Sequence, residues 1–208
     1  MDITFKQLAR LVSFIDKIEG ETYPETPSFI HTEITAKVLD ILLPQYGISQ
    51  NSRILDIGCG QGPALDIFRG KGYLSAVGIT LNEEDVRVCC ENGHDVRKMD
   101  QSFLDFPDGS YDLVWARHVI EHSVFPYFTL TEFARVLAPG GMLYLEVPAP
   151  ETSCHHETNP NHYSVFGRGA WVSLLGRCGF TLSDEAKYSF TTGMGPDEYW
   201  GFICSKPS

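Results

Sequence analysis

A glycine-rich turn at residues 58–62 does most to limit the folds open to this chain. It follows the strand-like segment Ile-Leu-Asp-Ile at residues 54–57 and leads directly into Pro63, a residue favoured in the first turn of a helix. Glycines at positions 58, 60 and 62 let the backbone bend sharply and let a ligand approach the main chain without meeting Cβ atoms. Amides at the start of the following helix can hold a polar ligand. The segment therefore predicts a strand, a tight loop and a helix, with a ligand at the loop.

Short apolar runs alternate with helical patterns from residue 53 onward, which is typical of successive strand–helix units and a mostly parallel sheet. We expect strands at residues 53–58, 75–80, 95–100, 111–117 and 142–148. Two more strand-like segments, 180–190 and 199–205, are separated by a Gly-Met-Gly-Pro turn and predict an antiparallel hairpin. The predicted fold class is α/β, with a seven-stranded, mostly parallel sheet, helices on both faces and the hairpin at its C-terminal edge.

Two amphipathic helices are predicted before the first strand. Apolar residues spaced by three and four form one helical face, namely Phe5, Leu8, Leu11, Val12 and Ile15. The proline- and glycine-containing stretch 20–29 predicts a loop, and a second helix follows and ends near Pro44 and Gly47. This leading pair is a candidate lid.

Helix boundaries are also readable further along the chain. Asn82 followed by three acidic residues is an N-cap pattern, and Asn92-Gly93 is a matching stop. A helix through Leu130 and Leu137 should end at the Pro-Gly-Gly of residues 139–141, and a last one should end at Gly179.

Charge and composition narrow the classes of partner. The formal net charge of -11 over 208 residues opposes binding to phosphate backbones or anionic lipid heads. The N-terminal segment mixes charges into its apolar residues, unlike a signal peptide, and no apolar run approaches the length of a membrane span. Six cysteines form no CxxC pair, which argues against a zinc site or a disulfide framework. We expect a cytoplasmic protein without nucleic-acid or membrane partners; the oligomeric state is not predicted.

The glycine spacing separates two kinds of cofactor. A dinucleotide-binding loop has glycine at its first, third and sixth places, whereas the sixth place from Gly58 is Pro63. A nicotinamide site is therefore disfavoured.

Four segments resemble motifs of the class I S-adenosylmethionine-dependent methyltransferases, especially those acting on small molecules, as in ubiquinone biosynthesis. Residues 55–62 resemble the family's acidic-x-Gly-x-Gly-x-Gly motif. Residues 100–114 are similar to its segment around the third and fourth strands, 119–122 to its Glu-His motif, and 135–141 to its signature before the fifth strand. The four lie in the family's order. The resemblance implies a Rossmann-like sheet, S-adenosyl-L-methionine as cofactor and methyl transfer to an O, N or C nucleophile of a small molecule.

The resemblance also implies which residues hold the cofactor. Gly58, Cys59 and Gly60 would contact its methionine part through the backbone, with Gln61 in the same loop and Asp56 ordering that loop.

At the next strands, the resemblance implies that Asp100 receives the adenine amino group and that Gln101 and Ser102 lie along the ring. Arg117 and His118, just beyond the fourth strand, would face the methyl group or the methionine carboxylate.

One position departs from the family. The second strand normally ends in an acid that accepts hydrogen bonds from the ribose, but here Thr80 and Leu81 stand in its place. A threonine hydroxyl loses the charge-assisted bond, so Asn82 or Glu83 is an alternative acceptor.

Histidines are the candidate catalytic groups, because imidazole titrates near neutrality and a hydroxyl or amine acceptor is helped by a base. His118, His122 and His162 are our ordered hypotheses, and solvated loop histidines are the alternative. The adjacent pair His155-His156 lacks the one-turn spacing of metal ligands on a helix, so no metal is predicted. The long polar loop 149–169 should shape the acceptor site together with the N-terminal helix.

A single domain, 1–208, follows from the length. Residues 1–50 would form the N-terminal helices, 51–148 the cofactor-binding core, and 149–208 the acceptor-site loop, the last helix and the edge hairpin. Two other functions remain open: a non-catalytic S-adenosylmethionine-binding sensor or partner module, and, less favoured, a nicotinamide-dependent oxidoreductase.

Overall fold

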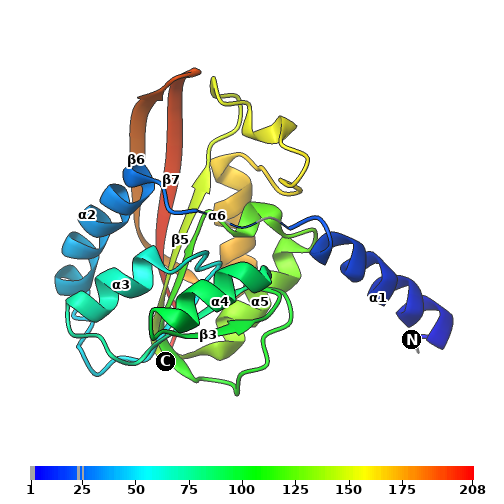
Figure 1. The fold of residues 1–208 in the computed structure, drawn as a ribbon, viewed down its shortest axis with the longest axis horizontal. Coiled ribbons are helices and arrows are strands. Elements are labelled where there is room, and N and C mark those ends of the chain that lie inside the picture. The colour runs from blue at the N-terminus through cyan, green and yellow to red at the C-terminus, as the bar shows by residue number, and fades with distance from the viewer. Residues whose placement is uncertain (1–2, 23, 25) are drawn as a thin grey trace.

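A twisted sheet forms the centre of the computed structural model, which describes residues 3–22, 24 and 26–208 (Figure 1). The described residues form seven strands in the order β3-β2-β1-β4-β5-β7-β6. Strand β7 runs antiparallel to β5 and β6, and the other neighbours are parallel. The strands are β1 (Ile54–Ile57), β2 (Ala76–Thr80), β3 (Asp95–Lys98), β4 (Tyr111–Arg117), β5 (Leu137–Pro148), β6 (Thr181–Thr192) and β7 (Gly195–Ser205). The predicted α/β sheet with an antiparallel edge hairpin is confirmed.

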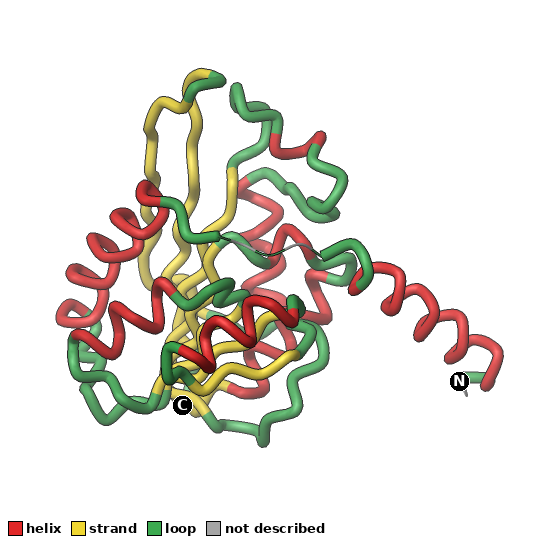
Figure 2. Tube along the Cα trace, viewed as in Figure 1, coloured by secondary structure: helices red, strands yellow, loops and turns green. Residues whose placement is uncertain are grey.

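Helices cover both faces of this sheet (Figure 2). They are α1 (Phe5–Glu19), α2 (Phe29–Gln45), α3 (Pro63–Gly70), α4 (Glu83–Glu91), α5 (Pro126–Val136) and α6 (Arg168–Arg177), with short 3-10 helices η1 (Ile120–His122) and η2 (His156–Thr158). Of the loop predicted at 20–29, Tyr23 and Glu25 lie outside the described residues. No helix within the described ranges combines the length and the apolar composition that a membrane crossing requires.

The strand alternation decides which helices cover which face. On β4, Leu113 and Trp115 pack with α2 and α3, whereas Val114 and Ala116 pack with α5 and α6. These four side chains are at most 1% exposed, and each large apolar side chain buried in this way contributes about 1.5–3 kcal/mol. Both faces of β4 are therefore core, which explains its unbroken apolar run.

The predicted helix end at residues 139–141 is wrong. Helix α5 ends at Val136, and Leu137 is already extended, with φ -71° and ψ 136°, pairing with Tyr111 of β4. Gly140 takes a φ of 74°, and its amide donates to the carbonyl of Lys206. The Pro-Gly-Gly segment thus lies inside the first part of strand β5, because pairing with neighbouring chain segments outweighs its local stop signal. Similarly, β7 begins at Gly195 and not near Tyr199, since Gly193 and Met194 suffice for the turn.

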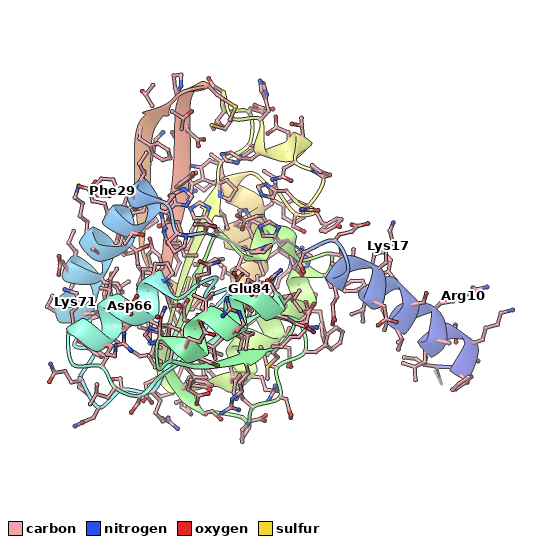
Figure 3. All side chains as sticks on the ribbon, viewed as in Figure 1. Arg10, Lys17, Phe29, Asp66, Lys71 and Glu84 are labelled. Carbon is pink, nitrogen blue, oxygen red and sulfur yellow. The ribbon has the colours of Figure 1, made fainter. Side chains whose placement is uncertain are left out.

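Helix α1 is confirmed by the structure, but its apolar face does not pack as an amphipathic pattern suggests. The helix projects from the body of the molecule, and the side chains of Arg10 and Lys17 extend outward (Figure 3). Its apolar face is open to solvent, with Phe5 86% and Leu8 49% exposed. The C-terminal end of α1, by contrast, reaches the sheet edge that carries the main cleft.

Candidate active site

A cleft opens where β1, β2, β3 and β4 end, which is where open α/β sheets bind ligands. It holds about 1040 Å³ of space not filled by protein atoms, including space open to solvent. The lining comes from the ends of these strands, from the end of α1 and from the loops after β4 and β5. It comprises Ile15, Ile18, Glu21, Thr22, Gly58, Gly60, Ile79, Thr80, Leu81, Asn82, Asp85, Met99, Asp100, Gln101, Ser102, Phe103, His118, Val119, His122, Ser123, Val124, Phe125, Asn161 and Tyr163.

The glycine loop lies at the base of this cleft, although its glycines serve different purposes. Gly58 has a φ of 70°, and a Cβ there would lie 2.5 Å from Cγ2 of Val119. A glycine is therefore required at position 58 because Val119, in the segment after β4, leaves no room for a side chain. This requirement holds whether or not a ligand binds at the loop. Gly60, with a φ of 50°, lines the cleft.

Cys59 and Gln61 do not lie where we expected. The amide of Cys59 donates to the carbonyl of Ile79 at 3.0 Å, and its Sγ faces Gly78 on the far side of the loop. Neither Cys59 nor Gln61 lines the cleft in the described part of the chain. We therefore correct the prediction of a backbone contact at Cys59, because strand pairing with β2 already occupies that amide.

Asp56 sits beneath the loop and is almost fully buried, at 3% exposed. Among the described residues its Oδ2 has no hydrogen-bond partner. Burial raises the pKa of this carboxyl to about 7. A buried acceptor without a donor costs free energy, so the site favours an incoming donor or a bound proton.

The end of β2 offers an acid that the sequence pattern did not reveal. Thr80 and Leu81 line the cleft as expected, but Asn82 caps α4, its Oδ1 accepting from the amide of Glu84 at 2.9 Å. Glu83 forms an ion pair with Lys98 instead. Glu83 does not line the cleft in the described part of the chain, whereas Asn82 does, with its Oδ1 already bonded to an α4 amide. Asp85, in the first turn of α4 and 1% exposed, lines the cleft.

Residues 100–102 line the cleft after β3. Their side chains also form hydrogen bonds within this segment, to helix α5 and to the segment after β4. Oδ1 of Asp100 accepts from the amide of Ser102 at 2.6 Å, and Ser102 Oγ lies 2.7 Å from Thr129 Oγ1. Gln101 donates to the carbonyl of Val119 at 2.8 Å, while its buried Oε1 has no partner among the described residues. Gln101 thus presents an open acceptor at this edge of the sheet.

Arg117 does not face the cleft, which corrects our prediction. Its Nε lies 2.7 Å from Oε1 of the fully buried Glu146, and its Nη1 donates to Thr35 Oγ1 of α2 at 3.1 Å. Because β4 side chains alternate between the faces of the sheet, Arg117 points under α2.

His118 does line the cleft, but both ring nitrogens face carboxylates. Nε2 lies 2.9 Å from Glu146, and Nδ1 lies 3.5 Å from Glu121. Burial lowers the pKa of His118, but the hydrogen bonds and charges of the two carboxylates outweigh it, and the pKa lies above its usual value. The left-handed φ of 53° at this residue is uncommon outside glycine. This geometry favours a positioning role over that of a free base.

His122 and His162 meet at the rim of the cleft although they lie 40 positions apart in the sequence. Their ring centroids are 4.8 Å apart. The amides of Tyr163 and Ser164 both donate to the carbonyl of Glu121, which fastens the loop after β5 onto η1. The long loop thus contributes to the cleft, through Asn161 and Tyr163.

Sequence reasoning missed Asp85, Glu121 and Glu146. The pairing of Glu146 could have been predicted from the sequence, because a buried glutamate inside the apolar run of a central strand needs a partner. Asp85 looked like one of three ordinary acids in the first turn of a helix.

Comparison with known proteins points in one direction. The methyltransferase domain family matches residues 28–184. A 27-O-demethylrifamycin SV methyltransferase from Amycolatopsis mediterranei is 31% identical over 153 residues, which are 65% of this chain and 56% of that protein. A sterol 24-C-methyltransferase from Yarrowia lipolytica is 32% identical over 144 residues, or 64% of this chain and 37% of that protein. The chain thus spans about half or less of the length of these relatives.

A solved structure shares the fold. The SAM-dependent methyltransferase from Archaeoglobus fulgidus superposes with a TM-score of 0.68 over 84% of this chain and 94% of its own, at 21% sequence identity. Likeness at that identity is evidence for the architecture alone.

Proposed function

The chain belongs to the methyltransferase domain family of class I S-adenosylmethionine-dependent methyltransferases, and from this premise we propose that it transfers a methyl group from S-adenosyl-L-methionine to a small-molecule acceptor. One observation carries the proposal: a single cleft is lined by Gly58 and Gly60 after β1, Thr80 after β2 and Asp100 after β3. Two of these three strand ends, those of β1 and β3, carry segments that resemble the family's motifs.

The residues present fit an adenosyl cofactor. Gln101 Oε1, in the cleft wall, is a buried acceptor that lacks a donor among the described residues, and so is Asp56 Oδ2, which lies beneath the glycine loop and outside the cleft lining. A cofactor with amino and hydroxyl donors would satisfy such groups, which is favourable because unpaired buried acceptors are costly. Gly60 allows close approach to the main chain.

We assign the ribose hydroxyls to Thr80 and Asp85. The carboxylate of Asp85 can supply the charge-assisted hydrogen bond that the threonine cannot. Its buried place in the cleft wall, next to the end of β2, supports this assignment. The adenine would lie against residues 100–102.

Asp85→Asn is expected to weaken cofactor binding while preserving the fold. Loss of a hydrogen bond to a charged acceptor costs about 1.5–3 kcal/mol, which raises Kd about tenfold to a hundredfold. Calorimetric titration with S-adenosylhomocysteine measures this change. Glu84→Gln is the matched control, because Glu84 lies in the same turn but pairs with Arg87 at the surface. Equal affinities of Asp85→Asn and wild type would refute the ribose assignment.

On the acceptor side, we place residues 1–50 and 149–208 around the site, with 51–148 holding the cofactor. S-Adenosylmethionine supplies an electrophilic methyl group, so the protein must hold the acceptor in line and exclude water. The names of the rifamycin and sterol methyltransferases describe small-molecule acceptors, and the net charge of -11 opposes a nucleic-acid acceptor. Both support a small molecule here.

His122→Ala and His162→Ala are each expected to lower turnover by about a hundredfold or more, the range of a lost acid–base group. The affinity for S-adenosylmethionine should stay unchanged, since the residues assigned to the cofactor come from the ends of β1, β2 and β3 and both histidines come from segments after β4. Release of S-adenosylhomocysteine in the presence of acceptor measures turnover. His155→Asn is the control, because that side chain is 68% exposed and belongs to the same loop. Full turnover in both alanine variants would remove these histidines from the reaction.

The proposed function is tested by two measurements on the wild-type chain. Calorimetry should detect S-adenosylmethionine and S-adenosylhomocysteine but not NAD. A screen of metabolite extracts should then find acceptor-dependent release of S-adenosylhomocysteine. Binding without turnover would favour the sensor module, and NAD binding alone would overturn the proposal.

A further inference from the structure

We propose that Glu121, His122 and His162 form a binding site for one divalent transition-metal cation at the rim of the cleft. Each residue offers one ligand atom, and these atoms all lie within 4.8 Å of one another. Ligand atoms bound at about 2.0–2.2 Å to a common ion lie roughly 3.5 Å apart. The three side chains therefore have to close by about an ångström around the ion.

The hydrogen bonds of both histidines prepare them as ligands. Nδ1 of His122 lies 2.9 Å from the carbonyl of Asn161, and Nδ1 of His162 lies 3.0 Å from the carbonyl of His156. A carbonyl oxygen can only accept, so each Nδ1 carries the proton and each neutral ring keeps its lone pair on Nε2. Metal-bound histidines are held in the same way, with the second ring nitrogen donating to a backbone carbonyl.

Glu121 supplies the negative charge. The residue is 2% exposed, and its Oε2 has no hydrogen-bond partner among the described residues, while Oε1 lies 3.5 Å from His118 Nδ1. A buried carboxylate oxygen of this kind is stabilised by a nearby cation. The backbone bonds from residues 163 and 164 to the Glu121 carbonyl hold the three side chains together without the ion.

The ligand set favours a particular class of metal. Two imidazoles and one carboxylate suit Zn²⁺, Fe²⁺ or Co²⁺, whereas Mg²⁺ and Ca²⁺ prefer oxygen ligands. Three protein ligands leave at least one position open. Because His122 lines the cleft, an acceptor hydroxyl in that position would lose its proton more readily. This last step rests on the proposed function, and the metal site itself does not.

The test is metal titration of the 208-residue chain after removal of metals with a chelator. Co²⁺ absorption and Zn²⁺ calorimetry, both without S-adenosylmethionine, should show one saturable site per chain. His162→Ala and Glu121→Gln should each weaken Zn²⁺ binding at least about tenfold. Circular dichroism checks that each variant is folded. If His162→Ala unfolds the loop, Glu121→Gln still tests the site, because glutamine keeps the shape of the glutamate side chain.

Two control variants test whether Zn²⁺ binds at this site or at other histidine and cysteine side chains of the same loop. His155→Asn removes an exposed histidine of the same loop. Cys154→Ser removes a member of a second cluster, formed with His156 and Asp197. Both should bind Zn²⁺ like the wild type. The proposal is overturned if the wild type shows no saturable site, if His162→Ala and Glu121→Gln bind normally, or if Cys154→Ser abolishes binding. Metal binding without cofactor binding would contradict only the proposed function, and cofactor binding without metal binding only this inference.

Discussion

Replacing Glu146 with alanine is expected to lower the free energy of unfolding by about 3–5 kcal/mol, the cost of removing one partner of a buried ion pair. The Glu146 side chain is 0% exposed and accepts from Arg117 at 2.7 Å, from His118 at 2.9 Å and from Tyr144 at 2.5 Å. Without it, the guanidinium of Arg117, only 8% exposed, is left buried without its counter-charge. Thermal denaturation followed by circular dichroism should show a melting temperature lower by about 6–20 °C for a chain of this length.

Glu185→Ala is the matched control, since Glu185 forms a bidentate pair with Arg168 on the surface. An exposed pair of that kind contributes about 0–1 kcal/mol. Glu146→Gln should fall between the two, because the amide keeps one acceptor but loses the charge. If Glu146→Ala loses no more stability than Glu185→Ala, the hydrogen-bond network of Glu146 with Arg117, His118 and Tyr144 does not hold the ends of β4 and β5 together.

The same network bears on the active site. Glu146 fixes the ring of His118 at the cleft wall, and the His118 amide donates to the Glu146 carbonyl at 2.9 Å. Any Glu146→Ala protein that remains folded should therefore also bind S-adenosylhomocysteine less tightly.

Asp56→Asn is expected to have opposite effects on stability and on ligand binding. Burial raises the pKa of Asp56 from 3.8 to about 7 in the folded protein. Between those values the folded carboxyl holds a proton that the unfolded one has released, so stability falls as the pH rises through this window. The full loss is present above about pH 7 and reaches at most about 4 kcal/mol, because each tenfold difference in proton affinity between the two states corresponds to about 1.4 kcal/mol. Asparagine carries no charge and escapes this loss.

Urea unfolding of the cofactor-free protein at pH 5 and pH 8 measures the effect. Asp56→Asn should be more stable than the wild type at pH 8. At pH 5 its gain in stability over the wild type should be smaller. Calorimetry at pH 8 should show weaker binding of S-adenosylmethionine, about tenfold or more, because a charged acceptor is lost. A stability gain that does not change between the two pH values would contradict the assigned role of burial.

Asp112→Asn, on the neighbouring strand β4, provides a contrast of opposite sign. The hydrogen bond from Arg53 lowers the pKa of Asp112, so its ionised form stabilises the fold. That contribution is present above the unfolded pKa and is lost as the pH falls through the folded one. Asp112→Asn should therefore destabilise the protein at pH 8 and leave cofactor binding unchanged.

Local patterns were enough to predict the sheet and several of the residues that line the cleft. The apolar run 113–116 and the glycine turn at 58–62 report burial and backbone conformation, both of which depend on a few consecutive residues. Motif order then placed Gly60, Thr80 and Asp100 at one sheet edge, and the structure brings all three to one cleft.

Predictions failed where a contact between distant segments decided the outcome. Arg117 was expected at the cofactor, but a carboxylate 29 positions later holds it under α2. Residues 139–141 were expected to end a helix, but the chain there is part of β5, which pairs with β4 and bonds to Lys206 near the C-terminus. The proposed metal ligands His122 and His162 come together only through the loop after β5, so no spacing rule applied to neighbouring residues could have found them.

By itself, the amino-acid sequence determined the α/β class, the strand–glycine loop–helix unit and the family, because each depends on short-range periodicity or on motifs in a given order. Tertiary structure alone decided the partners of Glu146, the place of Asp85 in the cleft wall and the meeting of Glu121 with two histidines. The physical reason is that hydrogen bonds and charges act over a few ångströms in space, whatever the number of residues between them along the chain.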